Sequence, residues 1–293
     1  MKLRLAATIC LLAVFLTACG GTESPTEAPT ETAASTESTY DLTDLALVDN
    51  EHCAFTVVGA EYNEHLGLQI RVLCRNKTDV PLTFSWNNTS VCGFAYEPFW
   101  AEEVAGGGEV SSTVTIDTYA LARMEIPSVD EITFTLHVQN SEEFLDDPVA
   151  DQRFTVYPTG KTPDLIQYPQ YRHKPEETVI VSGDVLTFII ENADQSLRDL
   201  YTLNCYMANH TDRNLMVTWE DVAVNGFDVD PYWAAVIPAG KQAYTQIIFY
   251  RGDLQERDIE VVQDVEFTLQ AADYEDWTSG YLLEEVYTYT PKH

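Results

Sequence analysis

The sequence predicts an all-β protein built from two copies of one β-sandwich domain, and three observations support this prediction. Apolar and polar residues alternate at period two through most of the chain after residue 45, as in strands with one buried face. Each half shows six or seven such segments in about 110 residues, separated by polar turns, which is typical of a β-sandwich. The second half of the chain also repeats the first.

The N-terminus carries an export signal. Lys2 and Arg4 precede an apolar run from Leu5 to Leu16, which is too short to span a bilayer and fits the core of a signal peptide. The run ends in Leu-Thr-Ala-Cys at residues 16–19, and this resembles the lipobox of bacterial lipoproteins. The resemblance implies that Cys19 is diacylated and anchors the protein at the extracellular face of the cell membrane. The alternative is an ordinary secretory peptide with a chance cysteine at its cleavage site.

A tether follows the anchor. Residues 22–39 contain only Thr, Glu, Ser, Ala and Pro, and without large apolar side chains such a segment is predicted to stay disordered and extended. The predicted organisation is therefore a signal peptide at 1–18, a lipidated cysteine and tether at 19–44, a first sandwich at 45–160, a linker at 161–175 and a second sandwich at 176–293.

The duplication is visible at an offset of 133 residues, which aligns 66–144 with 199–277 without a gap. Nineteen of the seventy-nine pairs are identical, and they cluster in an Asn-x-Thr-Asp element, in Trp86 and Trp219, and in a Gly-Phe-x-x-acid-Pro-aromatic-Trp element.

The segments at 121–126 and 254–259 are predicted to form short helical crossovers. The residues predicted to face the core are Phe55, Val57, Ile70, Val72, Cys74, Leu82, Phe84, Trp86, Val114, Ile116, Ile132, Phe134, Leu136, Phe154 and Val156, with Phe188, Ile190, Leu203, Cys205, Met207, Leu215, Val217, Trp219, Ile247, Phe249, Val265, Phe267, Leu269, Tyr287 and Tyr289 in the second copy.

The repeated elements resemble the immunoglobulin-like domains of lipoproteins from monoderm bacteria, many of unknown function, with the secreted immunoprotective-antigen family as one candidate relative. The resemblance implies an immunoglobulin-like sandwich in each copy. Cys74 precedes Trp86 as a B-strand cysteine precedes the core tryptophan in antibody domains, but Met207 stands at the matching site of the second copy. Neither copy has a cysteine near its late strand, so the inter-sheet disulfide of antibodies is predicted to be absent.

Charge excludes one class of partner. Sixteen basic residues face 47 acidic ones, and the formal net charge is −31. A field of this sign repels a phosphate backbone, so nucleic acid is excluded as a partner. Most carboxylates are predicted to lie on solvated strand faces and loops.

No motif for catalysis is apparent. The six histidines are scattered, and the glycine, serine and histidine spacings of common hydrolase and phosphate sites are absent from the sequence. Beyond Cys19, four cysteines remain after signal cleavage. Cys74 and Cys205 are predicted to be buried thiols, and a bridge from Cys53 to Cys74 or to Cys92 is the alternative. We therefore predict a protein that is not an enzyme, with a spatially assembled active site as the alternative.

The most distinctive element ends in paired aromatic residues, Phe99-Trp100 and Tyr232-Trp233. Its structural interpretation is a glycine turn followed by aromatic packing over the sheet edge. Neighbours in a strand face opposite ways, so one aromatic residue of each pair is a candidate exposed platform for a sugar or peptide.

Asp228 and Asp230 form an Asp-x-Asp pair in the second copy only. Together with further oxygen atoms, the two carboxylates are candidate ligands for calcium, which takes six to eight oxygens. The alternative is a solvated acidic loop. No other cofactor is predicted.

These observations predict a membrane-anchored extracellular lipoprotein that acts as a non-enzymatic display or interaction module. Its expected partners are the membrane lipid and an unknown extracellular protein or glycan. A carbohydrate- or peptide-binding protein that uses the aromatic platforms is the first alternative, and an enzyme is the second.

Overall fold

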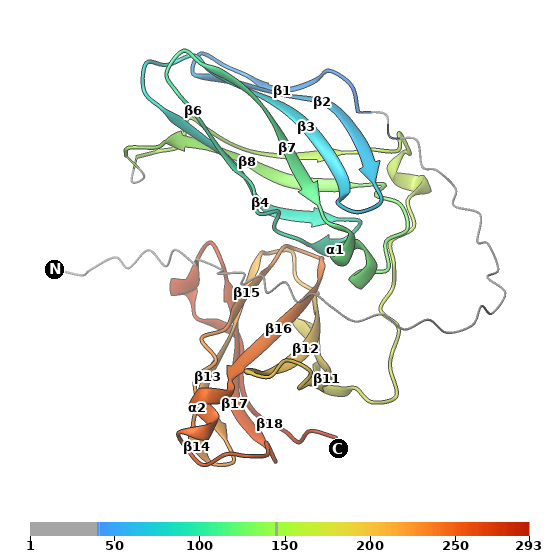
Figure 1. Ribbon diagram of the computed structural model, residues 1–293, viewed down its shortest axis with the longest axis vertical. Coiled ribbons are helices and arrows are strands. Elements are labelled where there is room, and N and C mark those ends of the chain that lie inside the picture. The colour runs from blue at the N-terminus through green and yellow to red at the C-terminus, as the bar shows by residue number, and fades with distance from the viewer. Residues whose placement is uncertain (1–39, 41, 144–145, 293) are drawn as a thin grey trace, which may run out of the picture. The chain divides into compact units, whose positions relative to one another are not determined.

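Figure 1 shows the computed structural model, which describes residue 40, residues 42–143 and residues 146–292. These residues belong to one compact unit. The predicted signal peptide, Cys19 and most of the predicted tether lie outside the described residues. Within the described part of the chain, the helices are too short and too polar to cross a bilayer.

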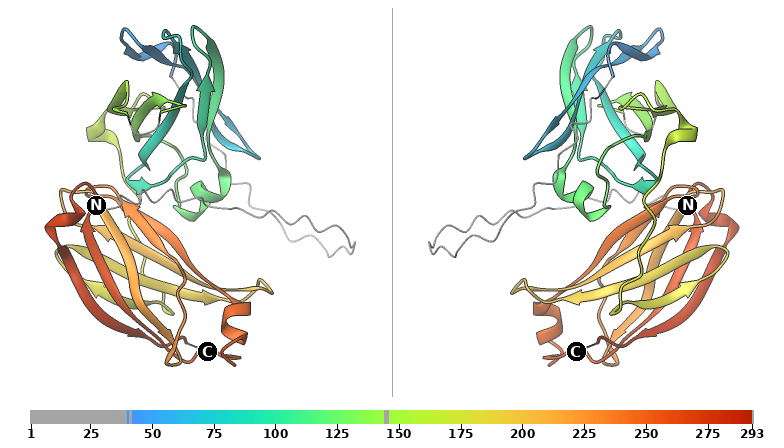
Figure 2. Two further views of the ribbon diagram at one scale, coloured as in Figure 1. Left: turned by 90° about the vertical axis from the view of Figure 1, so that its left-hand side faces the viewer. Right: turned by 90° about the vertical axis from the view of Figure 1, so that its right-hand side faces the viewer.

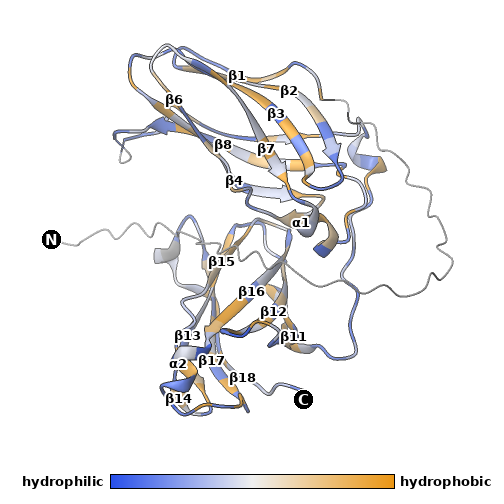
Figure 3. Cartoon of the chain, viewed as in Figure 1, coloured by the Kyte–Doolittle hydropathy of each residue, from blue (hydrophilic) through white to orange (hydrophobic). Residues whose placement is uncertain are grey.

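The fold is all-β, as predicted. Strands account for 53% of the described residues and helices for 6%. The strands form three sheets of four, nine and five strands. Figure 3 shows hydrophobic stretches in the strands β3 and β16 and hydrophilic residues along the connecting loops, which is the pattern of half-buried strands.

The first half of the described chain contributes two groups of antiparallel strands. One sheet has the order β1-β2-β3-β7, with strands at Leu45–Asp49, Cys53–Asn63, Gly67–Asn76 and Glu109–Ile116. The other group has the order β5-β4-β8-β9, with β6 also paired to β4. Its strands are β4 at Leu82–Val91, β5 at Phe94–Ala95, β6 at Ala101–Val104, β8 at Ile132–Asn140 and β9 at Ala150–Val156.

The second half repeats this arrangement. Strands β10 to β15 each begin 133 residues after β1 to β6, which extends the repeat beyond the segment of sequence similarity. The order β10-β11-β12-β16 matches β1-β2-β3-β7, and Figure 2 shows the yellow and orange strands of this group side by side. The order β14-β13-β17-β18, with β15 on β13, matches the other group. The strands are Thr178–Ser182, Leu186–Asp194, Leu200–Asn209, Leu215–Val224, Phe227–Asp228, Ala234–Ile237, Gln242–Tyr250, Val265–Asp273 and Tyr281–Tyr289 for β10 to β18 in chain order.

Two short α-helices overlap the predicted crossover segments 121–126 and 254–259, but each begins three residues earlier. They are α1 at Thr118–Arg123 and α2 at Arg251–Gln255, and two single-turn 3₁₀ helices lie at Pro163–Leu165 and Trp277–Ser279. Asp117 caps α1 because its side chain accepts a hydrogen bond from the backbone N–H of Ala120 at 2.8 Å.

The predicted core residues are buried, apart from Phe154 and Tyr287, which are half-buried. They form two clusters, one for each half of the chain. Trp86 stacks on Phe134 with ring centroids 3.7 Å apart, and Trp219 stacks on Phe267 at 3.6 Å. The two tryptophans therefore occupy equivalent core positions, as the alignment predicts.

The repeated Asn-x-Thr-Asp element has the same structural role in both halves. The Asn76 side chain donates to the carbonyl oxygens of Val80 at 2.7 Å and Val104 at 2.9 Å. Asn209 donates to the corresponding carbonyls of Arg213 at 2.7 Å and Ile237 at 2.9 Å. A buried side chain that satisfies two backbone acceptors explains why both copies carry this asparagine.

A short parallel pairing joins the two halves. The backbone N–H of Gln242 in β16 donates to the carbonyl oxygen of Gly93 at 2.9 Å, and β5 pairs with β16 beside it. The β10-β11-β12-β16 group and the β4 group therefore form one nine-stranded sheet. The Phe94 ring stacks on Tyr244 at 5.4 Å, so an apolar contact accompanies the backbone bond.

Candidate functional site

One residue of each candidate platform pair is exposed, but both pairs lie in the loops before β6 and β15 and not in strands, so strand alternation is not the cause. Phe99 is fully exposed, at 102% of its reference area, and Tyr232 is 91% exposed. Their neighbours Trp100 and Trp233 are only partly buried but pack against the two cores. Each pair thus offers one ring to solvent and holds the next ring against the core.

The inward tryptophan fixes each loop. The indole N–H of Trp100 donates to the Ser112 hydroxyl at 3.0 Å, and that of Trp233 donates to the Thr245 hydroxyl at 3.1 Å. Trp100 also meets Trp86 edge-on at 6.2 Å, and Trp233 meets Trp219 at 6.0 Å. These contacts anchor the exposed rings to folded sheet, which lowers the entropy lost when a ligand binds them.

Turn chemistry places the two loops. Gly93 and Gly226 have φ values of 86° and 79°, in the left-handed region that favours glycine. After each turn comes the proline, and the tryptophan then leads into β6 or β15. The structural interpretation of this element and its candidate binding role are therefore compatible, since different residues serve each.

The acidic residue before each proline holds its loop by a different bond. Glu97 accepts a hydrogen bond from the Thr89 backbone N–H at 3.0 Å. Desolvation raises the pKa of Glu97 to about 7, against the opposing effect of backbone hydrogen bonds from Thr89 and Asn88. Asp230 instead accepts from the backbone N–H of Tyr232 at 2.7 Å, and Tyr232 has a φ of 47°.

Tyr232 lies at the rim of an open acidic cleft of about 670 Å³ in the second half. The walls include Trp219, Val222 and Val229. The charged residues that line it are Glu220, Asp221, Asp228, Asp230, Asp253, Glu256 and Arg257. Six carboxylates against one guanidinium make this a negatively charged surface with one exposed aromatic ring.

The structure gives no further support to the calcium site. Asp228 and Asp230 line the same cleft, but the described residues bring together no group of three or more His, Cys, Asp or Glu side chains suited to a metal ion. The two aspartates as calcium ligands therefore stay a prediction.

The four described cysteines are free and buried. Cys53 lies opposite Asn76 and Cys74 lies opposite Phe55 in the β2–β3 pairing, so the two thiols are diagonal neighbours and not a directly facing pair. Burial raises the pKa of Cys74 to about 12. Thiols in this state are poor nucleophiles at neutral pH.

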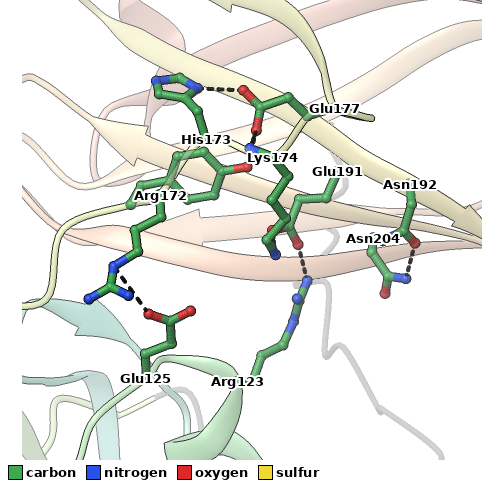
Figure 4. A network of polar contacts seen from close by, with 10 residues as sticks. Arg123, Glu125, Arg172, His173, Lys174, Glu177, Glu191, Asn192 and Asn204 are labelled. Atoms are coloured by element: carbon green, nitrogen blue, oxygen red, sulfur yellow. Dashed lines mark hydrogen bonds and ion pairs between the residues drawn. The ribbon is translucent and has the colours of Figure 1, made fainter.

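The structure contains a buried charge network between the two halves that the sequence analysis did not predict (Figure 4). The Glu191 carboxylate in β11 is fully buried and forms ion pairs with Arg123, at the end of α1, and with Lys174 in the linker. Glu191 follows the apolar run Phe188-Ile189-Ile190, and a charge within a buried strand was the signal available in the sequence. Its two cations come from segments far away in sequence, which only the fold brings together.

Aromatic rings surround this network. The Arg123 guanidinium lies 4.4 Å from the centroid of the Tyr244 ring, and Tyr171 of the linker stacks on Tyr206 at 3.9 Å. Lys241 forms a second ion pair across the halves, with Glu131 at 3.4 Å. The arrangement joins the two halves through both apolar and charged contacts.

Comparison with known proteins adds no assignment, because neither a protein-family model nor a curated protein matches the chain.

Proposed function

We propose that this protein is a lipid-anchored extracellular interaction module without enzymatic activity, built from two immunoglobulin-like β-sandwich domains at about 45–160 and 176–293. The recurrence of strand bounds and core contacts at an offset of 133 residues supports two copies of one domain. Two strand groups around one apolar cluster in each half are compatible with a sandwich in each copy.

The anchor at Cys19 remains part of this proposal and rests on the sequence. A lipid at the N-terminus followed by an extended acidic tether presents the folded part to extracellular partners. The net charge of −31 favours mutual repulsion between neighbouring copies and weak non-specific adhesion to anionic surfaces.

One observation favours capture of a carbohydrate or peptide as the specific activity. Phe99 and Tyr232 occupy equivalent positions and are almost completely exposed, although burial of an aromatic ring is favourable. The neighbouring tryptophans already perform the packing role in both copies. Rigid exposed rings suit stacking against a sugar face or a peptide side chain.

The test is a binding assay on the chain carrying Cys19→Ala, with cellohexaose, chitohexaose, mannohexaose and an oligoglycine-proline peptide as probes in isothermal titration calorimetry. We expect at least one probe to bind, and the double variant Phe99→Ala/Tyr232→Ala to lose most of the affinity. The control is Tyr119→Ala/Tyr250→Ala, which removes two exposed rings outside this element, 72% and 62% exposed. Equal loss in both double variants, or unchanged binding in the first, contradicts the platform role.

A further inference from the structure

A second pocket, of about 390 Å³, lies in the second half between β12 and the segment that follows α2. Its apolar wall consists of Leu254, Ile259 and Val262, which are all buried. The polar lining consists of Gln195, Tyr201, Arg251, Gln255 and Glu260. The pocket is distinct from the platform, because neither Phe99 nor Tyr232 lines it.

Tyr201, which lines this pocket, has an unsatisfied hydroxyl group. The residue is 2% exposed, and its hydroxyl has no hydrogen-bond partner among the described residues. Such a group destabilises the fold relative to a hydrogen-bonded one. Burial raises the pKa of Tyr201, so the group stays a protonated donor at neutral pH. An unpartnered donor of this kind is available to an acceptor on a ligand.

The first half shows that the fold does not need this hydroxyl. The residue 133 positions before Tyr201 is Leu68, which is fully buried and does the same packing without a polar atom. By contrast, the indole N–H groups of Trp86 and Trp219 are unpartnered in both halves and so belong to the common scaffold. The Tyr201 hydroxyl is a feature of the second half alone.

The other lining residues also divide into apolar ones shared by both halves and polar ones found only in the second half. The apolar wall is identical in the two halves, with Leu121, Ile126 and Val129 at the positions of Leu254, Ile259 and Val262. The polar lining differs at every position: Arg251, Gln195 and Gln255 replace Thr118, Tyr62 and Ala122. A shared apolar wall with new polar groups indicates a binding site added to a duplicated scaffold.

Arg251 supplies oriented donors at the mouth of the pocket. Its Nε donates to the Leu200 carbonyl at 3.2 Å and its Nη2 donates to the Gln195 side chain at 3.0 Å. These two bonds use two of the five N–H donors of a guanidinium and hold the group in place. The remaining donors suit an oxygen acceptor on a ligand.

The first half also indicates which group fits. There Tyr40 packs against the apolar cluster, and its hydroxyl lies near Tyr62 and forms a hydrogen bond with the backbone of Val129. These two residues correspond to Gln195 and Val262, which line the pocket of the second half. The position of Tyr40 corresponds to His173 in the linker, which instead pairs with Glu177. A phenol side chain of the chain itself thus covers in one half the surface that forms a pocket in the other.

We propose that the Tyr201 pocket binds an aromatic group that carries a hydrogen-bonding oxygen, with its ring against Leu254, Ile259 and Val262 and its oxygen accepting from Tyr201 and Arg251. The volume of about 390 Å³ is ample for one ring, since a cavity of about 150 Å³ accommodates benzene. The group belongs either to a free small phenol or to a tyrosine side chain of a peptide.

The experiment uses the full chain carrying Cys19→Ala, with p-cresol and toluene as probes in ligand-observed NMR. We expect p-cresol to bind more tightly than toluene. Tyr201→Phe removes only the hydroxyl, so it should weaken p-cresol binding about five- to tenfold, the loss expected for one hydrogen bond, and leave toluene binding unchanged. The control is Tyr62→Phe, which removes a tyrosine hydroxyl in the first half, at the position that corresponds to Gln195. It should change the affinity for neither p-cresol nor toluene.

A second arm distinguishes the source of the group. An acetylated hexapeptide with the sequence of residues 39–44, Thr-Tyr-Asp-Leu-Thr-Asp, should compete with p-cresol if the natural ligand is a tyrosine side chain. If p-cresol binds and the hexapeptide does not displace it, the natural ligand is a free small phenol. Absence of binding by every probe at millimolar concentration, or equal p-cresol affinity in Tyr201→Phe and the parent, overturns the proposal. Tyr232→Ala should leave p-cresol binding intact, which separates this outcome from failure of the platform.

Discussion

The guanidinium of Arg123 forms an ion pair with the carboxylate of Glu191, and the Glu191 side chain has no exposed surface. The two residues are 68 positions apart and belong to different halves of the chain. Lys174 binds the other carboxylate oxygen. A buried carboxylate with two cations is stabilising only while both partners remain, because desolvation of the unpaired charge is costly.

The first prediction concerns this network. Arg123→Met should lower the free energy of unfolding by about 2 kcal/mol, less than the 3–5 kcal/mol expected when a buried charge loses its sole partner, because Lys174 remains. The control is Arg172→Met, since Arg172 is 85% exposed and lies 3.8 Å from Glu125; it should change stability by less than about 0.5 kcal/mol. Denaturant unfolding measures both, and equal effects would contradict a special role for the buried pair.

In the aromatic loop of the second half, the partly buried Trp233 should matter for stability and the exposed Tyr232 should not. Trp233→Ala removes a ring packed on the second core and should destabilise the protein by about 2–3 kcal/mol. Tyr232→Ala removes a ring that is 91% exposed and should stay within about 0.5 kcal/mol of the parent. Thermal melting of both variants checks this, and a large loss of stability in Tyr232→Ala would show that the exposed ring is structural.

The anchor prediction tests the N-terminal sequence. Cys19→Ala removes the sulfur that the lipobox interpretation requires for acylation. We expect the variant to appear in the culture medium, whereas the parent sediments with membranes. Cys53→Ala is the matched control, because this cysteine is buried in the fold and should leave the protein with the membrane. Membrane retention of Cys19→Ala refutes the lipid anchor.

Glu177 should make stability depend on pH. Burial acts to raise the pKa of its carboxyl, but hydrogen bonds from the Lys174 backbone, the Tyr171 hydroxyl and His173 outweigh it, so the pKa lies below the ordinary value of 4.5. A lowered folded-state pKa stabilises the protein above 4.5, and this contribution is lost as pH falls through the folded-state pKa. Glu177→Gln should therefore be less stable than the parent at neutral pH and equally stable in acid. Melting temperatures across this range measure the difference, and a constant difference contradicts the linkage.

Salt should stabilise the protein because its acidic groups greatly outnumber its basic ones. At about 0.15 M salt the screening length is about 8 Å, so repulsion between exposed carboxylates weakens and the melting temperature should rise. At matched ionic strength, calcium should raise the melting temperature of the parent further only if Asp228 and Asp230 bind it, and Asp228→Ala should then remove that increment. An increment that is equal in both proteins removes these aspartates from the site, and indifference to salt would contradict the repulsion argument.

Local patterns predicted the strands because burial on one face imposes period two. The alternation around Trp86 and Trp219 marked the core positions, and the structure confirms their burial. The same reasoning led us to expect one exposed residue in the pair Phe99 and Trp100, but these residues lie in the loop before β6, where strand alternation does not apply. Which of the two is exposed depends on the Ser112 hydroxyl, which lies on β7 and accepts from the Trp100 indole.

The sequence by itself determined the all-β class, the repeat, the core faces and the two short helices, because each depends on neighbours in sequence or on a fixed offset. Only the tertiary structure decided the pairing of Gln242 with Gly93, the burial of Glu191 between two cations and the orphaned hydroxyl of Tyr201. These features depend on groups from distant segments, whose distances are set by strand pairing and core packing. Alternation along a strand predicts which face is buried, but it does not predict which residues from other segments contact that face.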